Sequence, residues 1–190
     1  MKKTFLTLFF IILTTNLYAS NIKKVYFAGG CFWCMEESFD KVEGVIETIS
    51  GYSGGHVKNP KYKDVVKNTT GHYETLEITY DPSITNFEKL LEIFWVNIDP
   101  FDADGQFCDK GESYKSVVFY ENSDQKKIIE TSIKNIENKF NKKVVTYVKN
   151  FKEFYMAETY HQDYYEKNFI RYLMYKKGCQ REEVLNKIWG

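Results

Sequence analysis

The sequence predicts a single α/β (α+β) domain in which helices cover one mixed β-sheet. Short runs of β-branched and aromatic residues, such as 25–28 and 72–80, interleave with segments of helical periodicity, such as 87–95 and 123–139. The connections include both hairpin-length and long ones, and this mixture favours a mixed sheet covered by helices. The 190 residues, 43% of them hydrophobic, suffice for one core, and neither a repeat nor a second domain is evident.

The chain is organised around segment 25–37. Its strand-like run ends in two glycines, and a helix-compatible segment beginning at Cys31 follows. Two glycines allow a tight turn from strand to helix, so we expect Cys31 at or near a helix N-terminus. The unpaired N–H groups and the dipole of a helix stabilise an anion there, which favours thiolate over thiol. Because Phe32 and Trp33 follow, the segment predicts an activated cysteine beside an aromatic pocket.

The strand predicted over 72–80 carries a carboxylate in an unusual position. Its residues alternate, so that Leu76, Ile78 and Tyr80 share one face, and a period of two places Glu74 on that same apolar face. Burial would raise the pKa of Glu74 and make it a proton donor near neutral pH. The alternative is that Glu74 lies at the end of the strand and meets water. The alternation alone does not decide between these two positions.

The remaining elements frame this site. We expect an apolar-striped helix that begins with a capping box from Thr85 to Glu88. The acidic loop 97–113 lacks the spacing of a calcium-binding EF-hand. We further expect strands over 42–50, 114–120 and 143–148, long loops over 51–71 and 97–113, a helix over 123–139, a partly helical aromatic segment from 151, a turn over 175–179 and a helix over 181–189.

The N-terminus has the pattern of a secretory signal peptide. Lys2 and Lys3 precede an apolar run over 5–13, and small or polar residues follow up to Ala19. We expect cleavage after Ala19, which divides the chain into a signal peptide over 1–19 and a domain over 20–190; an uncleaved membrane anchor is the alternative. The protein is therefore expected to be exported, either periplasmic or secreted. A formal net charge of zero and the lack of a Lys/Arg cluster argue against a nucleic-acid partner.

Export would place four cysteines, Cys31, Cys34, Cys108 and Cys179, in an oxidising setting. Two structural disulfides are one interpretation, although a domain of this size does not need such crosslinks. A four-cysteine zinc site is another, but structural zinc usually takes two close pairs, and Cys108 and Cys179 lie far apart.

Several short motifs resemble those of the A-type peptide methionine sulfoxide reductases, in the same order as in that family. The resemblance covers roughly 25–162. A cysteine at position 34, where the commonest form of the family has glycine, is a known variant. The motifs are Gly30-Cys31-Phe32-Trp33, Asn59-Pro60-Lys61-Tyr62, Thr70-Gly71-His72-Tyr73-Glu74, Phe94-Trp95, 105–111 (GQFCDKG), Ser113-Tyr114-Lys115-Ser116 and Tyr160-His161-Gln162.

The resemblance implies a role for each matching residue. Cys31 corresponds to the nucleophile and Glu74 to the proton donor for the sulfoxide oxygen. The others correspond to hydroxyl partners of that oxygen (Tyr62 and Tyr114), a carboxylate that holds the site together (Asp109), and a cage for the substrate methyl group (Phe32 and Trp33). The implied fold is a mixed α/β sandwich with a ferredoxin-like βαβ core.

The implied activity is the thiol-dependent reduction of methionine S-sulfoxide, in oxidised exported proteins or as the free amino acid. Attack by Cys31 releases methionine and leaves a sulfenic acid, which a second cysteine converts to a disulfide. A thioredoxin-type reductant then reduces that disulfide. We expect no metal or other cofactor, and a monomer. The family commonly resolves with a cysteine of a mobile C-terminal segment, which favours Cys179 over Cys34, with Cys108 third.

Two other functions remain open on the sequence. Cys31-Phe32-Trp33-Cys34 is also a C-x-x-C motif of the kind found in thioredoxin-like oxidoreductases. That fold requires a cis-proline loop facing the motif, and each of the three prolines here lies in a setting with another explanation. The second alternative is a disulfide-stabilised binding module without catalysis, which would lack a redox-cycling thiol.

Overall fold

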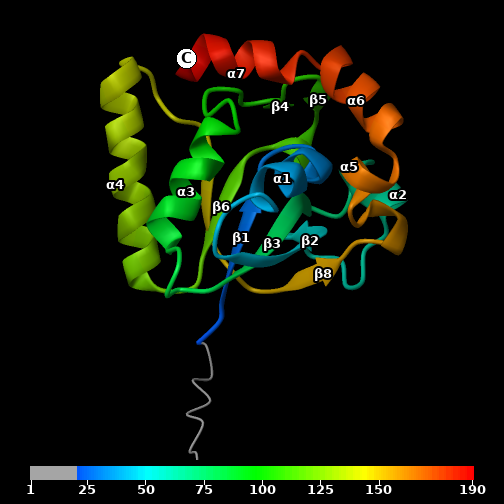
Figure 1. Cartoon of the computed structure of the whole chain (residues 1–190), viewed down its shortest axis with the longest axis horizontal. Coiled ribbons are helices and arrows are strands. Elements are labelled where there is room, and N and C mark those ends of the chain that lie inside the picture. The colour runs from blue at the N-terminus through cyan, green and yellow to red at the C-terminus, as the bar shows by residue number, and fades with distance from the viewer. Residues whose placement is uncertain (1–20) are drawn as a thin grey trace, which may run out of the picture.

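The computed structural model describes residues 21–190 and is built on one curled six-stranded sheet (Figure 1). The strands lie in the order β7-β6-β1-β3-β2-β8, and all neighbours are antiparallel except β6 and β7, which are parallel. Two further strands, β4 and β5, form a small hairpin. The bounds are β1 Lys23–Ala28, β2 Val45–Ser53, β3 Tyr73–Tyr80, β4 Gly105–Gln106, β5 Asp109–Lys110, β6 Val117–Tyr120, β7 Tyr147–Asn150 and β8 Phe154–Met156.

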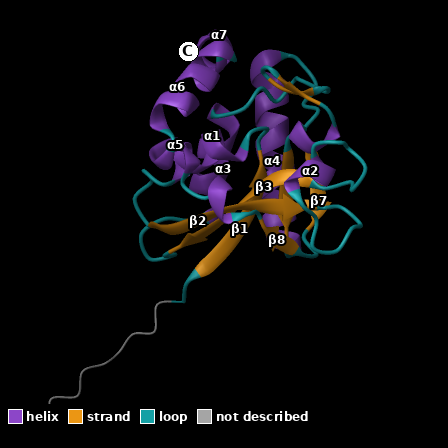
Figure 2. Cartoon of the chain, turned by 90° about the vertical axis from the view of Figure 1, so that its right-hand side faces the viewer, coloured by secondary structure: helices purple, strands orange, loops and turns teal. Residues whose placement is uncertain are grey.

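Seven α-helices and two 3₁₀ turns connect these strands in the described part of the chain. Figure 2 shows that α1, α5 and α6 gather beside the sheet, while α7 lies at one end of the molecule with the C-terminus. None of the helices within residues 21–190 is long and apolar enough to cross a membrane. The bounds are α1 Phe32–Phe39, α2 Tyr62–Val65, α3 Phe87–Val96, η1 Glu112–Tyr114, α4 Ser123–Phe140, η2 Thr159–His161, α5 Tyr164–Lys167, α6 Phe169–Gly178 and α7 Arg181–Trp189.

The four middle strands have the ferredoxin-like arrangement. β1 and β2 are both antiparallel to β3, which lies between them, and α1 connects them as a split βαβ unit. A second such unit runs from β3 through α3 to β6, with β1 between its strands. The predicted mixed α/β fold with a ferredoxin-like core is therefore confirmed.

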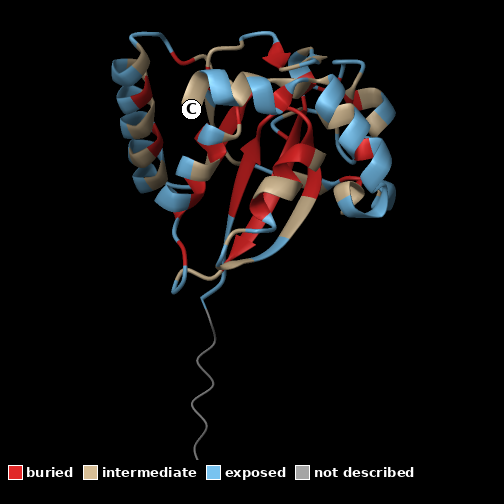
Figure 3. Ribbon diagram, turned by 45° about the horizontal axis from the view of Figure 1, so that its top comes forward, coloured by how far each residue is buried: buried red, intermediate tan, exposed pale blue. Residues whose placement is uncertain are grey.

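The alternation of side chains along β1 and β3 supplies two apolar clusters, one on each face of the sheet. Phe27 and Ile78 belong to the main core, which includes the buried stripe of α3 and residues of α1 and α4. Tyr26 points to the opposite face, where its ring stacks on Phe151 with centroids 3.7 Å apart. All of β3 is buried, and the middle of the sheet is correspondingly red in Figure 3. The site described below thus rests on the most buried strand.

Several strand boundaries differ from the sequence prediction. β2 begins three residues later than predicted and continues to Ser53, because Gly51 and the two residues after it pair with both β3 and β8. A Cβ atom on Gly51 would lie 2.3 Å from the ring of Phe154, so the glycine that suggested a loop permits this close approach. β6 is shorter than predicted because residues 112–114 form a 3₁₀ turn, and β7 begins at Tyr147 instead of residue 143.

Two helix predictions were also wrong. Residues 175–178, predicted as a turn, belong to α6, whose only buried residue is Tyr172, so that no apolar stripe marks the helix. The cap of α3 is Asn86 and not Thr85, because the Asn86 side chain accepts a hydrogen bond from the Lys89 N–H at 2.8 Å. The predicted signal peptide over 1–19 lies outside the described residues.

Candidate active site

Cys31 lies where β1 ends and α1 begins, as the two glycines predict. It is the N-cap residue of α1. Gly30 has a φ of 79°, a conformation that favours glycine, and a Cβ atom there would lie 2.6 Å from the Gln106 Cβ. This turn therefore directs the thiol toward the start of β3.

Glu74 meets Cys31 from β3, and its carboxyl group does not face water. Its side chain lies on the helix-covered face of the sheet, and the residue is only 2% exposed. The backbone N–H of Phe32 donates a hydrogen bond to Glu74 Oε2 at 3.1 Å. Burial raises the pKa of Glu74 well above its usual range. Burial therefore favours the protonated form of Glu74, and the alternative of a solvent-exposed strand end is wrong.

The sequence prediction of a Cys31 thiolate needs correction. Burial raises the pKa of the Cys31 thiol well above its ordinary value, and the neighbouring Cys34, Glu74 and Asp109 act in the same direction. The first N–H group of α1, which was expected to stabilise a thiolate, instead donates to Glu74. Cys31 therefore rests as a thiol, and its deprotonation has to accompany the arrival of a substrate.

A small pocket of about 40 Å³ opens between these two groups. Tyr62 enters it from α2 and Tyr114 from η1, and their hydroxyl groups interact with each other. Tyr114 also interacts with the Glu74 carboxyl group. Burial raises the pKa of Tyr62 to about 12 and that of Tyr114 further, so both phenols keep their protons at neutral pH. The pocket is lined by Cys31, Phe32, Trp33, Tyr62, Glu74, Asp109, Tyr114 and Tyr175.

Aromatic residues form one wall of this pocket. The ring of Trp33 stacks on Tyr164 with centroids 3.8 Å apart, and its Nε1–H donates to His161 Nδ1 at 3.2 Å. Phe32 packs against His161 at 5.0 Å between ring centroids. Tyr164 was not predicted as a site residue, although the density of aromatic residues after 151 was a signal for it.

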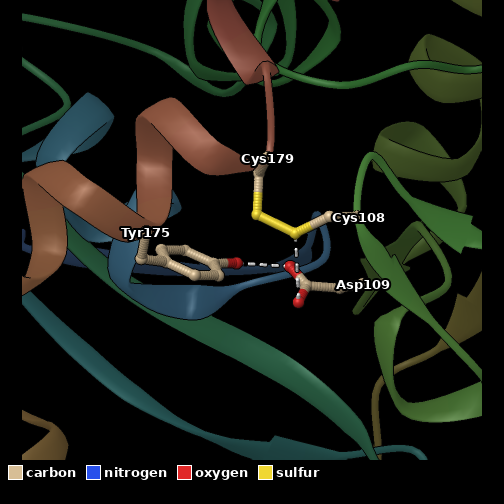
Figure 4. The surroundings of a disulfide bond; sticks show 4 residues. All are labelled: Cys108, Asp109, Tyr175 and Cys179. Carbon is tan, nitrogen blue, oxygen red and sulfur yellow. Dashed lines mark hydrogen bonds between the residues drawn. A yellow bond between two sulfur atoms is a disulfide. The ribbon is translucent and has the colours of Figure 1, made fainter.

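Asp109 also lines the pocket, and it lies beside a disulfide outside the pocket, which Figure 4 shows. The Tyr175 hydroxyl donates a hydrogen bond to Asp109 Oδ2, and Cys108 forms a disulfide with Cys179 across 71 residues of sequence. Cys31 and Cys34 remain free and buried. Because two of the four sulfur atoms are bonded to each other, the four cysteines do not form a zinc site. The predicted mobile turn at Cys179 is instead the end of a crosslinked helix.

Apart from the resolving cysteine, seven site residues were predicted, and all seven line this one pocket. A comparison with known protein families accounts for this arrangement. The family model described as peptide methionine sulfoxide reductase matches residues 23–190. The chain belongs to this family. It is 47% identical over 165 residues to peptide methionine sulfoxide reductase MsrA 2 of Staphylococcus aureus, covering 86% of this chain and 93% of that protein.

One further relative and one solved structure support the assignment to this family. MsrA of Bacillus licheniformis is 48% identical over 166 residues, covering 86% of this chain and 92% of that protein. The reduced form of Mxr1 from Saccharomyces cerevisiae has a similar structure, with a TM-score of 0.72 and 29% identity over 77% of this chain and 86% of that chain. The thioredoxin-like alternative loses its basis, because residues 21–190 contain no cis peptide bond.

Proposed function

We propose that this reductase reduces the S epimer of methionine sulfoxide, both in proteins and as the free amino acid, with Cys31 as nucleophile and Glu74 as acid. One observation carries the proposal: a buried thiol and a buried carboxyl group with a raised pKa line the same small pocket. A sulfoxide sulfur is a poor electrophile until its oxygen is protonated, so the reaction needs both groups at once.

The first step is the transfer of the sulfoxide oxygen to Cys31, and it requires a proton on that oxygen. As the substrate binds, Glu74 gives its proton to the sulfoxide oxygen, which Tyr62 and Tyr114 also contact, and the proton that Cys31 loses returns Glu74 to its acid form. The Cys31 sulfur attacks the substrate sulfur, the oxygen passes to Cys31, and methionine leaves as a thioether. Cys31 is then a sulfenic acid, the first oxidised state of a cysteine.

The size of the pocket fits the end of the substrate only. A volume of about 40 Å³ admits a methylsulfinyl group, and the aromatic wall of Phe32 and Trp33 suits its methyl. The rest of the substrate lies outside, so a free amino acid and a residue within an oxidised protein can both enter. The three-sided arrangement of ring, thiol and hydroxyl groups is chiral, and separate enzymes are known to serve the two sulfoxide epimers.

This selectivity gives the test of the proposed function. The purified protein, given racemic methionine sulfoxide and excess dithiol, should consume about half of it and leave the R epimer. Chiral chromatography of the remaining sulfoxide checks this result. Consumption of both epimers at equal rates, or of neither, would contradict the proposal.

A dithiol of the thioredoxin type completes the cycle by reducing the disulfide that follows the sulfenic acid. Its thiolate attacks one sulfur of the bridge, and its second thiol releases the protein in reduced form. The protein is also proposed to act as a monomer.

The protein is also proposed to work outside the cytoplasm, on the basis of the charged and apolar N-terminal pattern over 1–19. When the full-length chain is produced in a bacterial host, N-terminal sequencing of the exported protein should begin at Ser20. A mature protein that still begins at Met1 and fractionates with membranes would instead support an anchor.

A further inference from the structure

The outer edge of β2 is open along part of its length. β8 pairs with this edge at residues 51–53, and no other strand of the described chain pairs with it. At Ser50 the edge is closed by the side-chain amide of Gln162, which accepts from the Ser50 N–H and donates to the Ser50 carbonyl oxygen, both at 2.9 Å. The stretch that remains open within residues 21–190 is therefore 45–49.

Thr48 presents unpaired backbone groups on this open stretch. In an antiparallel strand the N–H and C=O groups of every second residue point to the same side, and those of Ser50 point outward. The groups of Thr48 therefore point outward as well, where no described residue pairs with them. Ile46 and Glu47 beside it are exposed, whereas residues 50–53 are buried. An open edge of this kind can pair with an extended chain.

A groove of about 580 Å³ is lined by this stretch of β2. Residues 40 and 41 after α1 and residues around the start of α5 supply the rest of its polar lining, while the exposed side chains of Ile46 and Met156 offer apolar contacts. The groove is far larger than the catalytic pocket and shares no lining residue with it. It has room for several residues of a bound chain.

The groove is acidic. Lys41 is its one basic lining residue among those described, and it is paired with Glu37 at 3.2 Å. Glu47 and Glu166 form no ion pair within residues 21–190. A chain that carries lysine or arginine side chains is complementary to this charge. The four acidic lining residues are Asp40, Glu47, Asp163 and Glu166.

The segment 161–165 borders both the groove and the catalytic pocket. His161 and Tyr164 contact Trp33, which lines the pocket. Gln162 and Tyr165, which alternate with them in the sequence, line the groove. A chain that crosses this segment can therefore occupy both sites at once.

The length of β2 sets the spacing between the two sites. The ring of Tyr52 packs against Phe32 of the pocket with centroids 6.1 Å apart, and Thr48 lies four residues earlier in the same strand. Four residues of antiparallel strand span about 14 Å. A residue about four to six positions from a bound sulfoxide therefore reaches the open edge.

We propose that the open edge of β2 and its acidic groove bind the extended, basic chain on one side of an oxidised methionine in a protein substrate. This inference rests on the proposed function, which places the sulfoxide in the pocket. The substrate chain adds a strand beside β2, pairs with the backbone groups of Thr48 and places its cations near Glu47 and Glu166. Because the added strand must have free backbone groups, the substrates are unfolded or extended segments.

Peptide kinetics test the charge of the groove. Peptides of about nine residues carry methionine S-sulfoxide at the first or last position and lysines about four and six residues away, and matched peptides carry glutamates instead. The measured quantity is kcat/KM for each peptide divided by kcat/KM for free methionine S-sulfoxide. In one polarity the lysine peptide should exceed its glutamate counterpart about threefold at low salt, and by less at about 0.5 M salt. Equal values in both polarities would overturn the inference.

Two double variants locate this charge effect. Glu47→Gln/Glu166→Gln should remove the preference for lysine over glutamate. Glu88→Gln/Glu183→Gln removes two exposed carboxylates from α3 and α7 and should retain the preference. The same preference in both double variants would show that the peptide does not bind in the groove.

Backbone methylation of the lysine peptide tests strand pairing separately. An N-methyl group removes one N–H donor, and only every second residue of an added strand turns its N–H toward β2. Methylation of one residue at a time, about four to seven positions from the sulfoxide, should therefore lower the kinetic ratio at alternate positions. A uniform effect along the peptide, or none, would overturn the pairing.

Hydrogen exchange provides a readout that does not depend on turnover. In the Cys31→Ser variant, the lysine peptide should slow the exchange of the Thr48 amide, as followed by nuclear magnetic resonance. Protection that rises with protein concentration and not with peptide would show that a second copy occupies the edge, which would overturn the inference. Protection by the peptide, together with failure of the wild type to reduce free methionine sulfoxide, would support the groove and refute the proposed function alone.

Discussion

Replacement of Cys31 by serine should abolish the release of methionine from methionine sulfoxide. A serine hydroxyl provides no accessible anion near neutral pH, and no other free thiol within residues 21–190 lines the pocket. Loss of a catalytic nucleophile commonly costs about 10⁴-fold or more in rate. Chromatography of methionine formed by the purified Cys31→Ser variant, with substrate and dithiol in excess, measures the effect.

The side chain of serine is smaller than that of cysteine and should leave the fold unchanged, which circular dichroism can verify. Cys108→Ser is the matched control, since it also replaces a sulfur with oxygen but changes a residue outside the pocket. We expect this control to release the first methionine normally. Methionine release by Cys31→Ser at a rate close to that of the control would refute the assignment of the nucleophile.

Replacement of Glu74 by glutamine should slow the first turnover by roughly 10²–10⁴-fold, the usual range for general acid catalysis. Glutamine is nearly isosteric with the protonated acid and can still accept the hydrogen bond of the Phe32 N–H, but it has no proton to give to the sulfoxide oxygen. Single-turnover quenched flow with methionine S-sulfoxide measures the step. A rate within about threefold of the wild type would assign the proton to Tyr62 or Tyr114 instead.

The thermal stability of Glu74→Gln provides a control, because the direction of its change can be predicted. The folded-state pKa of Glu74 is raised, so the ionised form is disfavoured inside the protein, and Glu74 costs stability increasingly as the pH rises above the unfolded-state value. Glu74→Gln removes this cost. Its melting temperature at pH 7 should therefore equal or exceed that of the wild type, and a large decrease would mean that lost structure, and not a lost proton, explains slow turnover.

The sequence predicted the position of Cys31 and Glu74 because both follow from local rules. Two glycines after a strand determine where a helix can begin, and a period of two places Glu74 beside Leu76 and Ile78. The same reasoning found the buried stripe of α3, which follows a period near 3.6 residues. The catalytic roles assigned to these residues stay predictions.

The C-terminal third could not be predicted in the same way. α6 buries only Tyr172, so its sequence has no apolar stripe, and its place is determined by contacts with distant residues such as Glu37 and Asp109. The pairing of Cys108 with Cys179 could not be predicted either, because four cysteines allow three pairings and the sequence does not rank them. The pKa of Cys31 was predicted in the wrong direction, since burial depends on the tertiary structure.

The attachment of the last helix has a consequence for the order in which the molecule matures. Trp189 donates to the Ile98 carbonyl oxygen at 3.0 Å, and its ring packs edge-on against Phe140 at 5.2 Å, so α7 docks onto elements synthesised much earlier. Chains grow from the N-terminus, so α7 is synthesised after the strands and helices on which it docks. An incomplete chain can therefore contain the nucleophile and its acid while it still lacks the helix that contacts Ile98 and Phe140. The core next to the pocket is covered at this end only when α7 docks.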